Sequence, residues 1–337
     1  MMNCNRNPLS TEATRKALCD FYIAACTEDG GAYRFRLYED GKAEQIQKIP
    51  MPSPMFLQME NDLLWATLRA PFAENTESGI AAYDTKSGER VTEILSTKGV
   101  VSCHIAVDNG DVYCPNYVSG SVFLSPDRLS VHTGQGVDPK RQLSPHTHCT
   151  LFSPDKRFLL CCDLGIDSIF VYDRELNEIS RARVPDGAGA RHAIFSKDGK
   201  YVYCINEMGG SISVFSWDAP HLTLLNTVSI LPDGHDGIGA GAAIKLSQNG
   251  AYLYATERAS ATIVTLKVDG EKLTVLSHTD CKGVEPRDFT LLGGDRFAVC
   301  TNQFGNSVAF FKINEKAIPE YLYSIELGAP LCAIEIE

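Results

Sequence analysis

The feature that most constrains this chain is a repeated pattern of short strands and turns. The pattern is clearest between Arg191 and Asp218, where the sequence reads RHAIFSKDGKYVYCINEMGGSISVFSWD. Three apolar runs are separated there by two turns in which glycine stands beside polar residues, and such turns reverse the chain between antiparallel strands. In a hairpin of this kind the start of the first strand and the end of the second lie at the same edge. The pairs Arg191-His192 and Asn206-Glu207 are therefore expected to be neighbours in space.

The same strand–turn–strand pattern recurs along most of the chain. Equivalent first-strand positions fall near residues 57, 106, 151, 194, 245, 289 and 333, at spacings of 43 to 51 residues. A period of roughly 40 to 50 residues built from short strands is typical of a β-propeller, and the intervening segments lack helical periodicity. The last position has no strands after it, whereas the strands near Phe21 and Tyr33 lack a first strand of their own. The sequence therefore predicts an all-β, seven-bladed β-propeller whose ring is closed by a C-terminal strand that joins the N-terminal blade.

A single folded domain accounts for nearly the whole chain. We expect residues 1–18 to form a tail or a short helix and residues 19–337 to form one propeller domain. The net charge of −11 argues against a nucleic-acid partner or an anionic membrane surface. It does not exclude an anionic ligand, because a local cluster of arginines can reverse the sign of the field inside one cleft.

The cysteines and the N-terminal segment indicate the cellular compartment. The 12 cysteines contain no C-x-x-C pair, so buried free thiols in a reducing cytoplasm are the expected state, with disulfides or a zinc site as alternatives. The first residues lack the apolar core of a signal peptide, and no run of about 18 apolar residues occurs. We therefore expect a cytoplasmic protein without membrane association. The oligomeric state stays open.

Polar side chains gather where strand one of each repeat begins and strand two ends. In a propeller these positions share one face near the axis, while the opposite ends carry generic turns such as Ser153–Lys156. The chemistry is therefore expected at the axial mouth, although the same residues could be solvated loop residues or strand caps, and Arg191 and Glu207 could be only an internal salt bridge. The candidates are Arg69, His104, Asn116, Tyr117, His146, His148, Asp163, Arg191, His192, Asn206, Glu207, Glu257, Arg258, Arg287, Asn302 and Gln303.

We expect no metal and no cofactor. His146 and His148 alternate on an extended segment and point the same way, so Asp163 and His192 could complete a metal site, and this alternative stays open. The glycine-rich segment 237–242 follows a loop and opens a strand, so it is not a dinucleotide fingerprint. No serine stands in the G-x-S-x-G context of a serine hydrolase.

Several segments together carry a family resemblance. They are Pro145–His148 with Phe152–Asp155, Cys103-His104 with Asn116-Tyr117, Cys161–Asp167, Ala190–His192 with Asn206-Glu207, and Glu285–Phe289 with Asn302-Gln303. Over roughly residues 50–337 the chain resembles the lactonase family of seven-bladed propellers, which includes propeller-type 6-phosphogluconolactonases and fungal carboxymuconate cyclases.

The resemblance implies a catalytic site formed by His148, Arg191, Glu207 and Arg258. The expected substrate-binding residues are His104, Asn116, Tyr117, His146, Asp163, His192, Arg287 and Gln303.

The leading hypothesis is hydrolysis of a small anionic lactone, a phosphorylated sugar lactone. Arg191, Arg258 and Arg287 would supply positive charge for the phosphate and for the developing oxyanion. Either His148 or Glu207 would act as the general base. Two alternatives stay open: a cycloisomerase that closes a muconate carboxylate onto its own double bond, and a non-catalytic propeller that binds a ligand or a protein.

Overall fold

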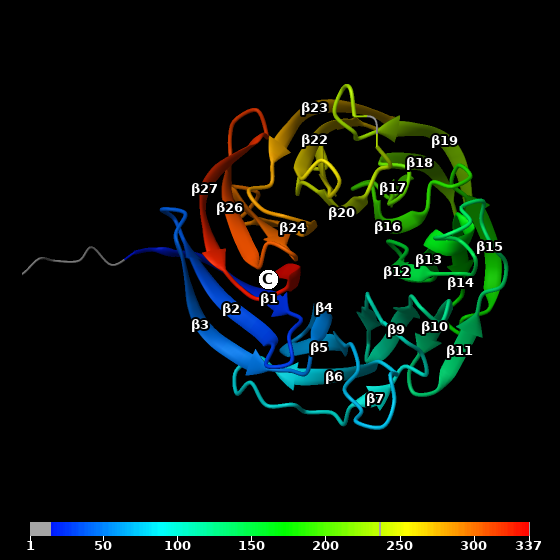
Figure 1. Ribbon diagram of the computed structural model, residues 1–337, viewed down its shortest axis with the longest axis horizontal. Coiled ribbons are helices and arrows are strands. Elements are labelled where there is room, and N and C mark those ends of the chain that lie inside the picture. The colour runs from blue at the N-terminus through cyan, green and yellow to red at the C-terminus, as the bar shows by residue number, and fades with distance from the viewer. Residues whose placement is uncertain (1–14, 236, 337) are drawn as a thin grey trace, which may run out of the picture.

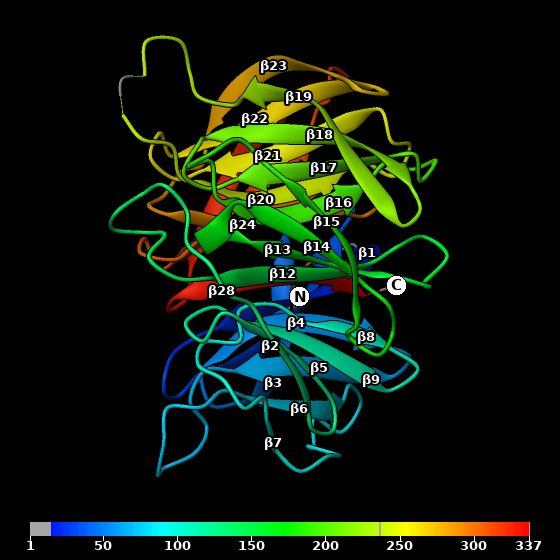
Figure 2. The ribbon, with the colours of Figure 1, turned by 90° about the vertical axis from the view of Figure 1, so that its right-hand side faces the viewer.

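Seven four-stranded antiparallel sheets surround a common axis in the computed structural model (Figure 1). The structure describes residues 15–235 and 237–336, and their regular structure is β-strand apart from one 3₁₀ turn. Figure 2 shows the same sheets from the side. The seven-bladed propeller predicted from the repeat is confirmed.

Each blade is a sheet of consecutive strands, ordered from the axis outwards. Blade 1 contains β4 (Pro54–Glu60), β5 (Leu63–Leu68), β6 (Gly79–Asp84) and β7 (Leu95–Ser96). Blade 2 contains β8 (Ala106–Asp108), β9 (Asp111–Asn116), β10 (Ser121–Leu124) and β11 (Arg128–Val131). Blade 3 contains β12 (Thr147–Phe152), β13 (Leu159–Asp163), β14 (Ser168–Tyr172) and β15 (Glu178–Arg183), with the 3₁₀ turn Leu164–Ile166 after β13.

The remaining blades follow the same order. Blade 4 contains β16 (Ala190–Phe195), β17 (Tyr201–Asn206), β18 (Ser211–Asp218) and β19 (His221–Ser229). Blade 5 contains β20 (Gly241–Leu246), β21 (Tyr252–Glu257), β22 (Thr262–Asp269) and β23 (Lys272–Asp280). Blade 6 contains β24 (Pro286–Leu292), β25 (Phe297–Asn302), β26 (Ser307–Ile313) and β27 (Pro319–Glu326).

The closing blade joins the two ends of the described chain. It contains β28 (Pro330–Ile336), β1 (Ala17–Ala25), β2 (Gly31–Tyr38) and β3 (Ala43–Pro50). β28 pairs antiparallel with β1, with Ala333 opposite Ile23, and the red and blue ribbons meet at this point in Figure 1. The expected closure of the ring is confirmed. β1 begins at Ala17, two residues before the expected domain boundary, and the rest of the expected tail, residues 1–14, lies outside the described residues.

Apolar side chains between neighbouring sheets form the core. Tyr203 and Ile205 of blade 4, for example, pack with Ile244 and Leu253 of blade 5, and all four are at most 5% exposed. The repeat positions identified in the sequence all lie in the innermost strands, so the hydrophobic pattern located the axis correctly. The sequence pattern did not resolve the outermost strands, because strands such as β15 are polar and only partly buried.

The cysteines of the described residues are free thiols, as expected from their spacing. Nine of these eleven cysteines are buried, and Cys19 and Cys26 are partly exposed. A buried thiol behaves as a small apolar side chain, so these residues contribute to the core of the blades. No helix in the part of the chain that the structure describes has the length and apolar character needed to cross a membrane.

Candidate active site

A break in strand register recurs near the start of the innermost strand of the blades. In blade 4 Ala190 pairs with Asn206 and His192 with Ile205, so Arg191 is left between the two pairs as a bulge. Such bulges re-aim a side chain, here towards the axis. The equivalent residues of all blades, which we call the floor ring, are Met55, Cys103, His148, Arg191, Ala242, Arg287 and Leu331.

A second ring of equivalent residues follows the second strand of each blade. The backbone N–H of Glu207 donates to Gly189 O at 2.8 Å, and that of Arg258 donates to Ala240 O at 3.1 Å. The same hydrogen bond, from the residue after the second strand to the residue two before the bulge, occurs in every blade. It holds the two rings together at one face of the propeller. The members, which we call the wall ring, are Cys26, Arg69, Tyr117, Leu164, Glu207, Arg258 and Gln303.

The two rings enclose a pocket of about 460 Å³ at the axis. Its floor residues are Met55, Cys103, His148, Arg287 and Leu331. Its wall residues are Arg69, Tyr117, Glu207, Arg258 and Gln303. The volume lies within the range of small-molecule sites. The structure therefore brings together eight of the candidates named from the sequence: Arg69, Tyr117, His148, Glu207, Arg258, Arg287 and Gln303 in the pocket, and Arg191 beside it.

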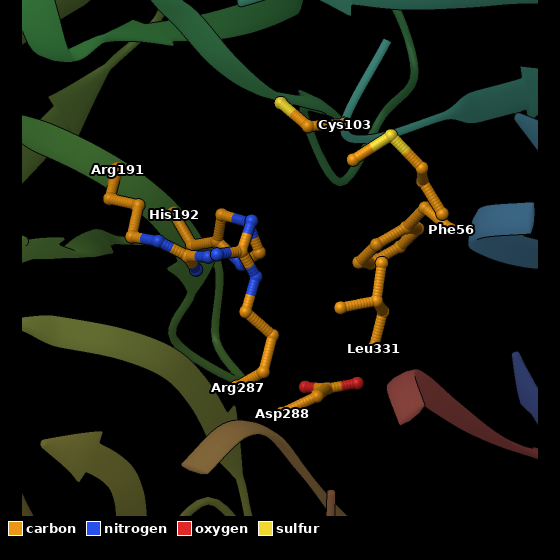
Figure 3. A pocket seen from close by; sticks show the side chains of 8 residues that line it. Phe56, Cys103, Arg191, His192, Arg287, Asp288 and Leu331 are labelled. Carbon is orange, nitrogen blue, oxygen red and sulfur yellow. The ribbon is translucent and has the colours of Figure 1, made fainter. Parts of the chain in front are cut away.

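Beneath the pocket lies a small cavity of about 10 Å³, which shares Met55, Cys103, Arg287 and Leu331 with it. Figure 3 shows Arg191, His192 and Arg287 converging from one side of this cavity, with Phe56 and Leu331 on the other. Basic side chains therefore line one side of the cavity and apolar side chains the other, and the carboxylate of Asp288, which pairs with Lys245, also lines it. The volume of the cavity is enough for one water-sized group.

Glu207 is the centre of an ion-pair network. Its Oε2 accepts hydrogen bonds from Arg191 Nε at 3.1 Å and makes an ion pair with Arg258 Nη2 at 3.0 Å, and its Oε1 accepts from Arg141 Nη2 at 2.6 Å. Arg191 Nη1 also donates to Ala242 O at 2.6 Å. The expected contact between Arg191 and Glu207 is present, and it fixes both side chains between neighbouring blades.

The charges in this network shift one another's pKa values. Burial opposes ionisation of Glu207, but Arg258 and Arg191 outweigh burial and lower the pKa of Glu207 far below its usual range. Burial, helped by Arg287 and Arg258, lowers the pKa of Arg191 to about 9, so its guanidinium stays charged at neutral pH. Glu207 is therefore a stable carboxylate and Arg191 a stable cation.

The histidines of the floor are held neutral. Burial, then the nearby charge of Arg191, lowers the pKa of His148 and of His192 well below the usual value of 6.5. Their ring centroids lie 5.0 Å apart, and neither His148 Nδ1 nor His192 Nε2 has a hydrogen-bond partner within the described residues. His148 also meets Tyr117 edge to face, with ring centroids 5.6 Å apart. A neutral imidazole on the pocket floor can accept a proton.

Four of the expected substrate-binding residues line neither the pocket nor the small cavity beneath it. Asn116 and Asp163 are the last residues of their second strands, and both are fully buried. Asn116 donates to Thr97 O and Ser121 Oγ, while Asp163 accepts from the backbone N–H groups of His146 and Gly165. These side chains cap turns of their own blades, because the wall position is one residue further along.

The other two lie close to the pocket without lining it. His146 stacks on Tyr117, with ring centroids 4.7 Å apart, and its Nδ1 is 2.9 Å from Tyr117 O. His104 packs on Phe56 and His192, and it lines a separate cavity of about 490 Å³ near Gln58. His146 therefore supports a wall residue, and His104 lies on the far side of Phe56 from the pocket floor.

Comparison with known proteins identifies the family of the chain. The family model described as "Lactonase, 7-bladed beta-propeller" matches residues 20–333. The chain belongs to this lactonase family. The family resemblance inferred from the sequence segments is therefore confirmed.

Proteins with and without an assigned activity are similar to the chain. An uncharacterized protein of Lactococcus lactis is 33% identical over 265 residues, which cover 72% of this chain and 77% of that protein. The 6-phosphogluconolactonase of Bacillus subtilis is 29% identical over 341 residues, which cover 92% and 96%. The solved periplasmic gluconolactonase of Pseudomonas aeruginosa has a TM-score of 0.86 and 25% identity, with coverage of 95% and 99%.

The alternative of a metal site near His146 and His148 finds no support in the geometry. Within residues 15–235 and 237–336, no group of three or more His, Cys, Asp or Glu side chains is arranged to hold a metal ion. His146 Nδ1 lies against Tyr117 O, and the Asp163 carboxylate is engaged with His132, 2.6 Å from its Nδ1. His146 and Asp163 are thus directed to other partners, whereas His148 and His192 each keep a ring nitrogen without a partner among the described residues.

Arg141 is the pocket residue that sequence reasoning missed. It lies in the long segment between β11 and β12, outside the repeat, and it reaches both Glu207 and the hydroxyl of Tyr117. The length of that segment is the sequence feature that could have drawn attention to Arg141. The apolar floor residues Met55 and Leu331 were also missed, although aligning the repeats on Arg191 and Arg287 places both at equivalent positions.

Proposed function

We propose that this chain hydrolyses a lactone with water in the pocket between the floor and wall rings. The observation that carries the proposal is that His148 and Glu207 line one pocket and that Arg191, beside this pocket, forms an ion pair with Glu207. A neutral base, a fixed cation and a carboxylate that holds the cation are the groups that ester hydrolysis requires. The resemblance to the lactonase family supports the same reaction class.

His148 is the better candidate for the general base. Both oxygens of Glu207 already accept hydrogen bonds from arginine, and its pKa is lowered far below the usual range, so it has little tendency to take a proton. His148 is neutral and lines the pocket. The imidazolium that forms during the reaction would be stabilised by the nearby charge of Glu207.

In the proposed reaction His148 removes a proton from water as its oxygen attacks the lactone carbonyl carbon. The carbonyl oxygen becomes an oxyanion, which the guanidinium of Arg191 stabilises. The carbon–oxygen bond of the ring then breaks, and the leaving alkoxide takes the proton from His148. One water is consumed, and the product is an open-chain hydroxy acid.

Arg258 acts as a positioning residue in this scheme. Its Nε donates to Ala240 O at 3.0 Å, its Nη1 to Glu285 at 2.7 Å, and its Nη2 lies 3.0 Å from Glu207. All of its nitrogens are thus engaged by the protein. We propose that Arg258 orients Glu207, which in turn orients Arg191.

The substrate we propose is a phosphorylated sugar lactone. Four arginines and two glutamates line the pocket, in a chain whose net charge is −11. The pocket therefore carries an excess of positive charge although the chain as a whole is negative, and this favours an anionic ligand. A relative named 6-phosphogluconolactonase, which the chain matches over 92% of its length, supports the same substrate class.

A second candidate is a muconate-type cycloisomerase. The apolar half of the floor, formed by Met55, Cys103 and Leu331, would suit an unsaturated carbon chain better than a polyhydroxylated one. The arginines would then bind carboxylates. One preparation assayed with 6-phosphogluconolactone and with 3-carboxymuconate separates the two functions. Acceleration of lactone opening alone supports the proposal, and turnover of the muconate alone replaces it.

A further inference from the structure

The arginines of the pocket differ in what they contact. Arg258, Arg191 and Arg141 all pair with Glu207. Arg287 lines both the pocket and the small cavity, yet its guanidinium makes no hydrogen bond or ion pair with any residue that the structure describes. All of its donors are therefore available to a ligand.

Among the described arginines that line the pocket, Arg69 is the second without an acidic partner, and it faces the same side of the pocket. Arg287 is the floor residue of blade 6, and Arg69 is the wall residue of blade 1. The closing blade stands between them with Leu331 and Cys26. Burial raises the pKa of Cys26, and the nearby charges of Arg69 and Arg287 oppose this shift, so both guanidiniums lie close to one thiol.

Arg287 is only partly buried and has no direct acidic partner among the described residues, although Glu207 and Glu285 lie close enough to oppose the lowering of its pKa. Burial, and then repulsion by Arg258, lowers the pKa of Arg287. A buried charge without a partner is normally neutralised, paired or lost from a structure. A guanidinium kept in this state at the floor of a pocket is accounted for when a bound anion supplies the missing charge.

We propose that Arg287 and Arg69 form the subsite for a phosphate monoester group of the substrate, across the pocket from His148 and Glu207. This inference rests on the proposed lactone hydrolysis. It specifies where the phosphate end and the lactone end of the substrate bind. Two guanidinium charges match the charge of about −1.5 to −2 that a phosphate monoester carries at neutral pH. A carboxylate would leave one of them uncompensated.

The small cavity fixes how deep the phosphate can lie. Its volume of about 10 Å³ admits one oxygen atom or one water, so the phosphorus must lie on the pocket side of Arg287. His192 lines this cavity, and its unpartnered Nε2 is a further polar group at the floor. The lactone ring is then directed towards Arg191 and His148.

A binding experiment tests the subsite without turnover. The full chain and its variants Arg287→Gln and Arg69→Gln are titrated calorimetrically with 6-phosphogluconate, gluconate and inorganic phosphate. Arg296→Gln is the matched control, because Arg296 is an exposed arginine at the opposite end of blade 6. Unchanged melting curves establish that each variant is folded.

We expect wild type and Arg296→Gln to bind 6-phosphogluconate about 10- to 100-fold more tightly than gluconate, as for a charge-assisted hydrogen-bonded pair. Arg287→Gln should lose most of this preference and Arg69→Gln part of it. Inorganic phosphate should compete with 6-phosphogluconate and not with gluconate. A wild type without the preference, or an Arg287→Gln variant that keeps it, overturns the subsite.

Kinetics separate this inference from the proposed function. In Arg287→Gln the ratio of kcat/KM for 6-phosphogluconolactone to that for glucono-δ-lactone should fall about 10- to 100-fold, through KM. Hydrolysis with an unchanged ratio would refute the subsite and leave the lactonase proposal standing. Phosphate-selective binding without hydrolysis of either lactone would support the subsite and refute the lactonase proposal. A stronger preference for a carboxylated lactone overturns the assignment of phosphate.

Discussion

Arg191 and Glu207 form an ion pair of 3.1 Å between Nε and Oε2, with side chains that are only 2% and 8% exposed. The pair joins the floor ring to the wall ring within blade 4. Glu207 also contacts Arg258 of blade 5 and Arg141 of the segment between β11 and β12. One carboxylate therefore links three segments of the ring.

Replacing Glu207 should damage stability as well as activity. Glu207→Gln leaves the buried charges of Arg191 and Arg258 without their carboxylate, and breaking such a pair costs about 3 to 5 kcal/mol in the free energy of unfolding. Chemical denaturation measures this cost. The double variant Arg191→Met/Glu207→Gln should be less destabilised than the sum of the single variants. Additive losses would show that the two side chains do not interact.

His148 should control the chemical step. We expect His148→Gln to lower kcat about 100-fold or more, with little change in melting temperature. Because the pKa of His148 is held well below 6.5, the wild-type rate should stay flat as the pH falls through 6.5 and decline only in more acidic solution. The exposed His221→Gln variant is the control. Full activity in His148→Gln would show that another group acts as the general base.

The buried histidines should make the fold sensitive to acid. The unfolded chain takes up protons on His148 and His192 near pH 6.5, whereas the folded chain does not, so the free energy of unfolding falls as the pH drops below that value. Glu207, whose folded pKa is lowered from 4.5, adds a further loss of stability below about pH 4.5.

Thermal melts between pH 8 and pH 5 measure the histidine contribution. His192→Gln should flatten the dependence of melting temperature on pH, and His221→Gln should leave it as in wild type. Equal slopes in all three proteins would contradict the assignment of buried, neutral histidines.

Asn116 should prove structural. Its side chain bonds Thr97 O, Ser121 Oγ and Ser102 Oγ inside blade 2, so Asn116→Ala leaves buried groups unpaired at a cost of about 1 to 3 kcal/mol. The variant should melt at a lower temperature but keep the wild-type KM for lactones. A large rise in KM without loss of stability would restore Asn116 to the site.

The contact between Arg191 and Glu207 could be predicted from the sequence because hairpin register is a local property. Period-two alternation and the two turns around β17 suffice to place Arg191 beside Glu207. Asn116 and Asp163, which the sequence also places at this edge, do not line the pocket. The last paired residue of the second strand turns inwards to cap a turn, and the residue after it faces the pocket.

The remaining features depend on contacts between distant segments. Arg141 lies outside the repeat, and its contact with Glu207 spans 66 residues, so no local pattern reports it. The bulge that aims Arg287 and Leu331 towards the axis depends on pairing with the neighbouring strand rather than on their own residue types. The difference between a fully engaged Arg258 and an unpartnered Arg287 emerges only from three-dimensional contacts.

The most direct test of the central claim is the rate at which the purified chain opens 6-phosphogluconolactone, compared with spontaneous hydrolysis and with a folded Arg191→Gln variant. The account predicts clear acceleration by the wild type and a loss of about 100-fold or more in the variant, as for removal of an oxyanion-stabilising group. A folded wild-type protein that gives no acceleration, or an Arg191→Gln variant as active as the wild type, would contradict it.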